Sequence, residues 1–422
     1  MSMALSDEHR ELAATVARWA ANTVGEAGRR HGLEVDDPPR HPAWDEMVAL
    51  GWPVLHAPES AGGQGFGLGD LAVVLEELGR AGVPGPLLPT VLAVAVLTEG
   101  EAPSELVARI ARGETATVAF SSEPIEGPGV VPNVLDAVSP GIAVVPVRTP
   151  GGVEWHAVDV GPEAIVGRGG VDLVRPVVSL AIDPPSDDRG RLRIDSARVT
   201  DLATLLLCCE AVGIGAWCVD TAASYARDRV QFGRPIGTFQ GVKHRCADML
   251  AALELARAAT WDAARGGDDD EEHLAIACAG ALVPELVAGI AKDCIQVLGG
   301  IGFTWEHDAH LFLRRALAIR ALLPASTSVR EHVVDLVSAG VVRTPGGVEW
   351  HAVDVGPEAI VGRGGVDLVR PVVSLAIDPP SDDRGRLRID SARVTDLATL
   401  RLCCEAGGIG AWGVDTAASY AR

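Results

Sequence analysis

A long tandem repeat at the C-terminal end limits what this chain can fold into. Residues 147–227 recur as residues 342–422, at an offset of 195 positions (342 minus 147). Solenoid repeats are short, numerous and divergent, whereas these two copies differ at three positions: Leu206 against Arg401, Val212 against Gly407 and Cys218 against Gly413. The pattern therefore indicates one recent duplication of an internal segment.

The copy contains only part of a folding unit. It begins inside a predicted strand and ends at Arg422, so it carries some strands of a sheet and one helix but not the other strands of that sheet. A partial sheet with unpaired edges is unstable by itself. We therefore do not expect residues 341–422 to form an independent domain, and we interpret them as a poorly ordered appendage. The alternative is a swap, in which the copy displaces the original segment in its own or a neighbouring subunit.

Composition restricts the classes of function. A net charge of −21 and a pI near 4.9 argue against binding to nucleic acid or to an anionic membrane surface. The most apolar run, Thr90–Leu97, is too short to span a bilayer, and the polar N-terminus does not resemble a signal peptide. The eight cysteines form no Cys-x-x-Cys pair and fall mostly in helical patterns, which is typical of reduced core residues. We predict a cytoplasmic protein.

Hydrophobic periodicity divides the chain into three domains that precede the copy. Residues 1–112 form a helical domain, with helices expected over 44–50, 68–80, 89–98 and 104–111. Residues 113–199 contain short β-rich runs between Gly and Pro clusters, which predicts a small antiparallel barrel or sandwich. Residues 200–340 form a four-helix bundle, with helices expected over 201–227, 238–265, 271–297 and 311–322. The expected fold class is α+β.

Two turns between the bundle helices combine glycine with amide, aromatic and cationic side chains. The first is Arg229-Val-Gln-Phe-Gly-Arg-Pro-Ile-Gly-Thr-Phe-Gln240, and the second is Gln296-Val-Leu-Gly-Gly-Ile-Gly-Phe-Thr-Trp-Glu306. Glycine lets a backbone approach a ligand closely, while Arg, Phe and Gln can hold a pyrophosphate, an adenine and a ribose. One such turn would be a weak signal, but the two together predict a dinucleotide site.

These turns resemble those of the acyl-CoA dehydrogenase family of flavoenzymes. Gly51-Trp-Pro-Val-Leu-His-Ala-Pro-Glu-Ser-Ala-Gly-Gly63 and Leu75-Glu-Glu-Leu-Gly-Arg-Ala81 also resemble the signature of that family's helical domain. The resemblance extends from about residue 5 to about residue 338. It implies FAD as cofactor, an acyl-CoA thioester as substrate, and an electron-transfer flavoprotein or a similar acceptor as partner.

The resemblance also implies a catalytic base. The family's reaction removes a proton from the carbon next to the thioester and passes a hydride from the following carbon to the flavin, so a carboxylate must accept the proton. In the family this base is a Glu at one of two places, which correspond to Leu323 and Ala203 in this chain. The acids nearest to Ala203 are Asp201 and Glu210. Glu210 lies on roughly the same helical face as Ala203 and is the candidate for a displaced base, with a paired structural acid as the alternative.

The flavin contacts that the resemblance implies fall into two groups. In the family, the two turns reach the flavin of the neighbouring subunit, and this chain keeps that set: Arg229, Gln231, Phe232, Gln296, Gly299 and Gly300. Contacts to a subunit's own flavin come from the β-domain, where Ser121-Ser-Glu-Pro124 resembles a remnant of a Thr-Glu-Pro strand end, with Ser122 as a flavin contact. The Gly-Ser-Asp that follows in the family is missing. We therefore expect a non-catalytic subunit that completes the flavin site of a second dehydrogenase-like subunit, in an α2β2 heterotetramer.

Two other functions stay open. The chain could be a self-sufficient acyl-CoA dehydrogenase that uses Glu210, or a catalytically inactive scaffold or binding protein. Paired subunits can open a wider pocket, so a steroid-type or branched acyl-CoA ester is a candidate substrate by analogy, beside fatty acyl-CoA. We expect no metal site, because His307 and His310 share a helical face without a third ligand nearby. Arg314 and Arg315 either pair with acids or contact the phosphates of CoA.

Overall fold

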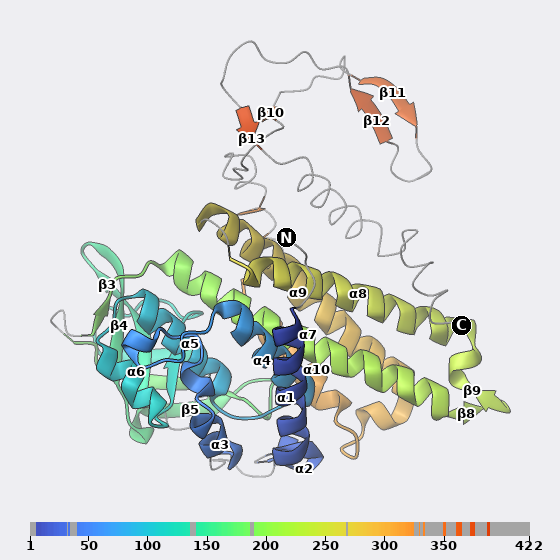
Figure 1. Cartoon of the computed structure of the whole chain (residues 1–422), viewed down its shortest axis with the longest axis horizontal. Coiled ribbons are helices and arrows are strands. Elements are labelled where there is room, and N and C mark those ends of the chain that lie inside the picture. Colours follow the sequence, from blue (N-terminus) through green and yellow to red (C-terminus); the bar gives the residue numbers. More distant parts are fainter. Residues whose placement is uncertain are drawn as a thin grey trace.

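The structure is a computed structural model of the chain, and three regions follow one another along it. It describes residues 6–31, 33, 40–135, 141–185, 190–266, 269–324, 329 and 332–333, and the strand segments 349–351, 360–364, 372–375 and 386–388. An N-terminal helical region is followed by two β-sheets and then by a C-terminal helical region (Figure 1). The predicted order of helical, β and helical regions is confirmed.

The N-terminal region is built from short helices around a buried apolar helix. Its α-helices are α1 (Asp7–Thr23), α2 (Gly25–Arg29), α3 (Ala43–Ala49), α4 (Leu68–Ala81), α5 (Leu87–Glu99) and α6 (Ser104–Ala111), with the 3-10 helices η1 (Trp52–Val54) and η2 (Glu59–Ala61). Ser6 begins α1, because its hydroxyl accepts a hydrogen bond from the backbone N–H of His9 at 3.1 Å. Every residue of α5 from Leu87 to Leu97 is buried, so the apolar run in the sequence is a core helix.

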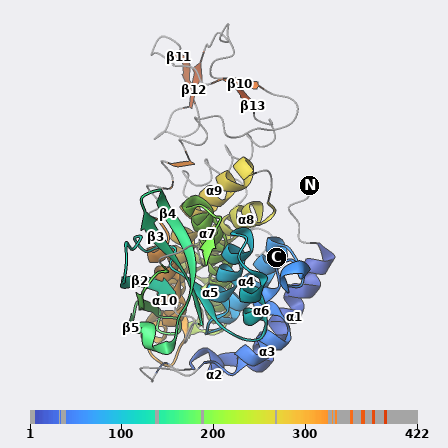
Figure 2. The ribbon, with the colours of Figure 1, turned by 90° about the vertical axis from the view of Figure 1, so that its left-hand side faces the viewer.

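The middle region consists of two sheets that lie beside the helices (Figure 2). The first has the strand order β1-β3-β4-β7, and the second has the order β2-β6-β5. The strands are β1 (Ala116–Val118), β2 (Gly129–Leu135), β3 (Ile142–Thr149), β4 (Gly152–Asp159), β5 (Ile165–Gly169), β6 (Val177–Ile182) and β7 (Arg191–Leu192), with the 3-10 helix η3 (Pro162–Ala164) before β5.

The prediction of a purely antiparallel β-domain is wrong around β3, which has a parallel neighbour in β1 and a parallel bridge from Ile125 to Val147. Strands β1 and β3 are parallel, with Ala116 opposite Ile142. The intervening chain passes through β2 in the other sheet and returns, so β3 enters the first sheet in the direction of β1. Strand β2 has no simple alternation of buried and exposed residues, because its pairing with β6 shifts between Val131 and Val134, where Asn133 has a φ of +57°.

Four helices form the part of the C-terminal region that the structure describes up to Leu322, and α7 lies at its centre (Figure 1). They are α7 (Ser196–Asp228), α8 (Gln240–Ala264), α9 (Asp269–Leu298) and α10 (Ala309–Leu322). Helix α7 packs against α4 and α5 as well as against the other three helices. The approach to α4 is close: a Cβ atom added at Gly213 would lie 1.9 Å from the carbonyl oxygen of Glu76, so only glycine fits there.

Two of these helices are long and apolar enough to cross a membrane. The apolar window is 94% buried within the protein in α7, and 72% buried in the helical span Glu271–Phe303 that includes α9. Burial of this extent is what core helices of a bundle show.

The duplicated segment repeats some strand pairs of the original. Its described strands are β10 (Glu349–His351), β11 (Ile360–Gly364), β12 (Val372–Leu375) and β13 (Arg386–Arg388). Trp350 pairs with Leu387 as Trp155 pairs with Leu192, and Ile360 pairs with Leu375 as Ile165 pairs with Leu180. The copy has no equivalent of β2 and begins at the sixth residue of β3. The expectation that 341–422 is not an independent domain, and its swap alternative, concern residues that mostly lie outside the described ones.

Candidate functional site

The two glycine-bearing turns lie at the same end of the helical bundle. Helices α7, α8 and α9 follow one another in alternating directions, and Arg245 near the start of α8 donates to Asp293 near the end of α9. The turn between α7 and α8 and the turn after α9 therefore lie at one end of the bundle. We call residues 229–240 and 296–306 together the turn end. The topology therefore brings together the two sets of residues that the sequence predicts to contact one dinucleotide.

The first turn holds a phenylalanine in a strained and exposed position. Strands β8 (Val230–Gln231) and β9 (Arg234–Pro235) pair antiparallel with Gln231 opposite Arg234, which leaves Phe232 and Gly233 as a two-residue loop. Their φ angles are +55° and +79°, as a type I′ turn requires. Phe232 is 92% exposed. A left-handed conformation is uncommon for any residue other than glycine, so the local structure holds this ring out from the protein.

A cation and two aromatic rings surround this loop. The guanidinium of Arg234 lies 4.1 Å from the centre of the Phe239 ring, and the Phe232 ring meets Phe239 edge to face at 6.1 Å. Gln231 Nε2 donates to the backbone oxygen of Val230 at 2.8 Å. Arg229 ends α7, with its backbone N–H bonded to Tyr225 and its side chain exposed. The loop thus offers a stacking surface beside exposed positive charge.

The second turn offers open backbone. Gln296 is exposed on the last turn of α9, and the 3-10 helix η5 (Gly299–Phe303) follows. Gly299 has a φ of +66°, and a Cβ added at Gly299 or Gly300 would meet no atom within 4 Å. The glycines here are therefore needed for conformation and for approach by another molecule, not for internal packing. Phe303 beside them is 80% exposed.

Buried ion pairs fix the start of α10 and thereby the second turn. Asp308 is buried and accepts hydrogen bonds from Arg29 at 2.6 Å and from Arg30 at 2.7 Å. Arg30 also donates to the backbone oxygen of Trp305 at 2.6 Å. Charge-assisted bonds of this kind are among the stronger ones in proteins, so α2 orders a turn that lies more than 270 positions away (278 between Arg30 and Asp308).

The two positions that correspond to the family's base are apolar and buried. Ala203 is fully buried, and Leu323 is 5% exposed. Glu210 is occupied by other partners: its two carboxylate oxygens accept from the two Nη atoms of Arg175 at 2.8 and 2.6 Å. Arg315 lies 3.5 Å from the same carboxylate. The geometry is that of a paired structural acid, with both oxygens bonded to a buried arginine.

Arg315 joins Glu210 to a second acid. Its Nε donates to Asp172 at 2.9 Å, its Nη1 donates to the backbone oxygen of Val83 at 2.9 Å, and the whole side chain is buried. Arg314 donates to the backbone oxygen of Val171 at 3.3 Å. The sequence left two roles open for Arg314 and Arg315, pairing with acids or contact with the phosphates of CoA. The structure shows Arg315 bonded to an acid and Arg314 bonded to backbone.

The serine expected to contact the chain's own flavin and the histidines at the start of α10 have local surroundings. The Ser122 hydroxyl donates to the backbone oxygen of Pro132 in β2, and the Ser121 hydroxyl donates to that of Asn133 at 3.2 Å. His307 Nδ1 accepts from the backbone N–H of Ala309, the first residue of α10, at 3.1 Å. Burial lowers the pKa of His307. The pKa of His310 is likewise lowered by burial.

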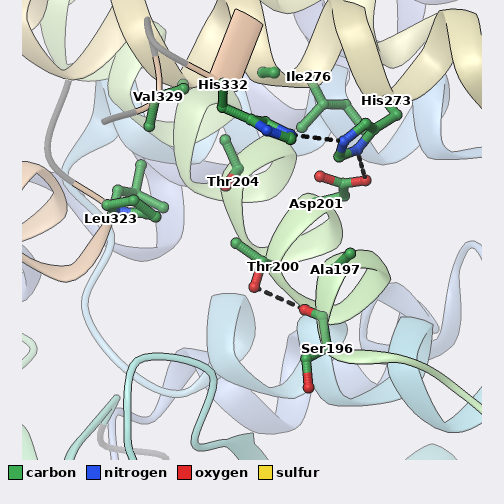
Figure 3. A pocket seen from close by; sticks show the side chains of 13 residues that line it. Ser196, Ala197, Thr200, Asp201, Thr204, His273, Ile276, Leu323, Val329 and His332 are labelled. Atoms are coloured by element: carbon green, nitrogen blue, oxygen red, sulfur yellow. Dashed lines mark hydrogen bonds and ion pairs between the residues drawn. The ribbon is translucent and has the colours of Figure 1, made fainter. Parts of the chain in front are cut away.

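A cavity of about 390 Å³ lies between α7, α9 and the residues after α10 (Figure 3). It is lined by Ser196, Ala197, Thr200, Asp201, Thr204, His273, Ile276, Ala277, Gly280, Leu323, Pro324, Val329 and His332. Asp201 Oδ2 lies 2.6 Å from His273 Nδ1, and His273 Nε2 lies 3.0 Å from His332 Nε2. Sequence reasoning missed both histidines, because 72 positions and a change of helix separate Asp201 from His273 and no local motif links them.

Comparisons with known proteins identify the family. Residues 6–114 match the domain described as Acyl-CoA dehydrogenase, N-terminal domain, and residues 198–323 match Acyl-CoA dehydrogenase, C-terminal domain. The chain is 37% identical over 350 residues to the acyl-CoA dehydrogenase FadE34 of Mycobacterium tuberculosis, covering 80% of this chain and 48% of FadE34. It thus spans about half the length of that relative. It is 32% identical over 327 residues to the acyl-CoA dehydrogenase IpdE2 of Mycolicibacterium smegmatis, covering 76% of this chain and 95% of IpdE2.

The fold comparison agrees with the sequence comparison. A chain of the ChsE4-ChsE5 complex from Mycobacterium tuberculosis matches with a TM-score of 0.73 and 23% identity, covering 80% of this chain and 99% of that one. The chain belongs to the acyl-CoA dehydrogenase family of oxidoreductases and has its fold, and FAD is the cofactor of that family.

Proposed function

We propose that this chain is the non-catalytic subunit of a heteromeric acyl-CoA dehydrogenase and completes the FAD site of a second, catalytic subunit. The assembly oxidises an acyl-CoA thioester between its α and β carbons, as an α2β2 heterotetramer in the cytoplasm. The observation that carries the proposal is a contrast within the chain. The turn end is exposed and free to contact another molecule, whereas the positions of the base are filled by apolar residues, Ala203 and Leu323.

The chemistry of the turn end fits one half of a dinucleotide site. The exposed Arg229 can form paired hydrogen bonds with a pyrophosphate. Phe232 is positioned to stack on adenine. Gln296 offers an amide to a ribose, and the open backbone at Gly299 and Gly300 offers room for close approach. All six predicted contact residues of the two turns are exposed, as contacts to a flavin seated on another chain must be.

The self-sufficient alternative requires Glu210 to act as base. Its carboxylate would have to leave Arg175 and turn toward a substrate, which would leave a buried guanidinium without its partner. Breaking a buried pair in this way costs about 3–5 kcal/mol. This cost counts against Glu210 as the base and supports the non-catalytic role.

The partner and the substrate class follow by analogy. The matched structure from Mycobacterium tuberculosis is a complex of ChsE4 with ChsE5, and another match is the steroid acyl-CoA dehydrogenase Tcur3481-Tcur3483 (TM-score 0.72, 24% identity). We extend these arrangements to this chain: its partner is a second dehydrogenase-like chain with an intact base, and its substrate is a bulky, steroid-type acyl-CoA. An electron-transfer flavoprotein or a similar acceptor would reoxidise the flavin.

The proposal is tested by purifying the full chain alone and together with a dehydrogenase-like chain that has an intact Glu. We expect the chain alone to lack stoichiometric flavin absorbance and turnover with acyl-CoA, and the pair to hold one FAD per heterodimer. Arg229→Ala should weaken FAD retention by the pair about 10- to 100-fold, as expected for one lost charge-assisted bond to a phosphate.

The matched control is Arg320→Ala, which removes an arginine of α10 from its partly exposed pair with Glu285 of α9 and should leave FAD retention unchanged. Stoichiometric FAD and turnover in the chain alone would contradict the proposal. A stable pair whose FAD content does not respond to Arg229→Ala would instead support a scaffold.

A further inference from the structure

The cavity beside α7 has an apolar body and one polar end. Ala197, Ile276, Ala277, Leu323 and other small or aliphatic residues form most of its wall. Asp201 and the two histidines converge at the other end (Figure 3). A volume of about 390 Å³ lies within the range of small-molecule sites. The wall also includes the hydroxyl residues Ser196, Thr200 and Thr204 of α7, of which Thr200 donates to the backbone oxygen of Ser196 at 2.8 Å. The chemistry is that of a mainly apolar pocket with its ring nitrogens gathered at one end.

The hydrogen bonds at the polar end define which groups donate. A carboxylate only accepts, so His273 Nδ1 carries a proton and donates to Asp201 over 2.6 Å. In the neutral tautomer that this bond selects, His273 Nε2 is an acceptor, and His332 Nε2 lies 3.0 Å from it, within reach to donate. Asp201 thus holds His273 in one tautomer, with its basic nitrogen on the far side from the carboxylate.

The groups around Asp201 leave the cavity facing the imidazole of His273 and not the carboxylate. Burial raises the pKa of Asp201, and the hydrogen bond from His273 opposes that effect. Arg198 and Glu272 also act on Asp201, and these two pair with each other at 3.1 Å. The imidazole of His273 therefore lies against the Asp201 carboxylate. The opposite charges of Arg198 and Glu272, which also act on Asp201, offset each other. A ligand in the cavity would meet an imidazole nitrogen, not a bare negative charge.

The residue that now donates to this nitrogen is easily replaced. His332 is exposed, whereas His273 is half-buried on α9 and its other nitrogen is held by Asp201. A hydroxyl group that enters the cavity can take the place of His332 as the donor to His273 Nε2. The exchange substitutes one hydrogen bond for another, and the apolar walls then supply the gain from burial.

We propose that this cavity binds an uncharged, mainly apolar ring compound carrying a hydroxyl group, which donates its hydrogen bond to Nε2 of His273. The site consists of residues of this chain alone, and one of them, Leu323, occupies a position that corresponds to the family's base. It is separate from the turn end, because it lies beside the start of α7 whereas the first turn follows the end of that helix. Asp201 is a positioning residue in it, because it acts on the ligand only through His273.

The test uses two aromatic probes of similar size, 2-naphthol and 2-acetonaphthone, titrated into the full chain and followed by probe fluorescence. 2-Naphthol can donate a hydrogen bond, and 2-acetonaphthone can only accept one. We expect wild-type protein to bind 2-naphthol about tenfold more tightly, which is the size of one net hydrogen bond in a buried site.

Variants separate tautomer control from simple burial. Asp201→Asn removes the charge that fixes the tautomer, so the preference for 2-naphthol should fall from about tenfold toward none. His273→Gln should do the same, because an amide both donates and accepts. His332→Ala should keep or increase the preference. Ala277→Phe fills the cavity and should abolish binding of both probes. Circular dichroism establishes that each variant is folded.

Several results would overturn the proposal. These are equal affinity of the wild type for both probes, a preference that survives both Asp201→Asn and His273→Gln, and binding that survives Ala277→Phe. Parallel loss of both probes in the Asp201 and His273 variants would show a purely structural role for the pair and would also contradict it. None of these outcomes depends on FAD or on a partner chain, so failure here leaves the flavin proposal unaffected.

Discussion

The original segment 147–227 and its copy 342–422 have almost the same sequence but differ where packing is tightest. All three substitutions fall in the part that corresponds to α7, and Leu206, Val212 and Cys218 are each fully buried in the original. The copy has Arg, Gly and Gly at these positions. An arginine in that core would be a buried charge without a partner, and each glycine would leave a cavity. The copied helix therefore cannot replace α7 without a large loss of stability.

The strands of the copy differ from its helix in this respect, because residues 147–205 and 342–400 are identical. The described strands of the copy pair in the register of their originals. The copied strands could therefore replace the original strands in a swap, whereas the copied helix could not replace α7. Strand pairing needs only the copied sequence, but the place of the original segment in the core also needs residues outside it. Arg315 is one of these, because it contacts Asp172 and Glu210 and lies outside the duplicated segment.

The largest expected effect comes from giving the original the residue of the copy. Leu206→Arg places a guanidinium in the interface of α7 with its neighbours, where Leu206 is fully buried. We expect the free energy of unfolding to fall by at least about 4–5 kcal/mol, or the protein to fail to fold. Denaturant unfolding followed by circular dichroism measures this. Leu206→Met is the volume-matched control and should cost less than about 1.5 kcal/mol. A mild effect of Leu206→Arg would show that the copied helix can enter the core.

Removing Arg315, which the original segment contacts from outside the duplication, should have the next largest effect. Arg315→Met leaves Asp172 and Glu210 buried with fewer partners. We expect a loss of about 3–5 kcal/mol in the free energy of unfolding. Arg320→Met removes a partly exposed arginine that pairs with Glu285, and we expect a loss below about 1 kcal/mol there. Equal effects of the two variants would mean that the buried contacts of Arg315 hold the original segment no more strongly than a partly exposed ion pair would.

Both comparisons show what sequence reasoning could and could not reach. The helices of the bundle and the two turns were predictable, because periodicity and glycine-rich turns are local signals, and Phe232-Gly233 stands at the tip of its turn. The parallel pair β1–β3 and the irregular β2 depend on how distant segments meet. The same holds for Glu210, whose partner Arg175 is 35 positions away, and for the pair of Asp201 with His273. Such contacts carry no spacing that a single sequence reveals.

A smaller effect is expected from pH, and it arises outside the duplicated segment. Both ring nitrogens of His56 are shielded from solvent, and burial lowers its pKa to about 4. The unfolded chain then binds a proton more readily than the folded one, with an ordinary pKa near 6.5. Stability is therefore full above pH 6.5 and decreases as pH falls toward 4. We expect a loss of about 2 kcal/mol between pH 7 and pH 5 from this group.

His56→Leu should remove that part of the pH dependence, as measured by denaturant unfolding at both pH values. A chain lacking 341–422 should keep it, because His56 is not duplicated. If His56→Leu leaves the difference between pH 7 and pH 5 unchanged, the acid sensitivity arises at another group.

The smallest effect should follow removal of the copy itself. The described hydrophobic core ends at Leu323, and α7 contains all three positions at which the copy departs from the original. Deleting residues 341–422 should therefore change the free energy of unfolding of the remaining chain by less than about 0.5 kcal/mol. Deleting residues 309–422 is the control: it also removes α10, with the buried Phe312, Arg315 and Ile319, and should prevent folding. A loss of several kcal/mol on deleting the copy alone would mean that the copy supplies strands to the sheets of the preceding domains. In that arrangement the copied strands would replace the original ones, while Arg401 would still exclude the copied helix from the place of α7.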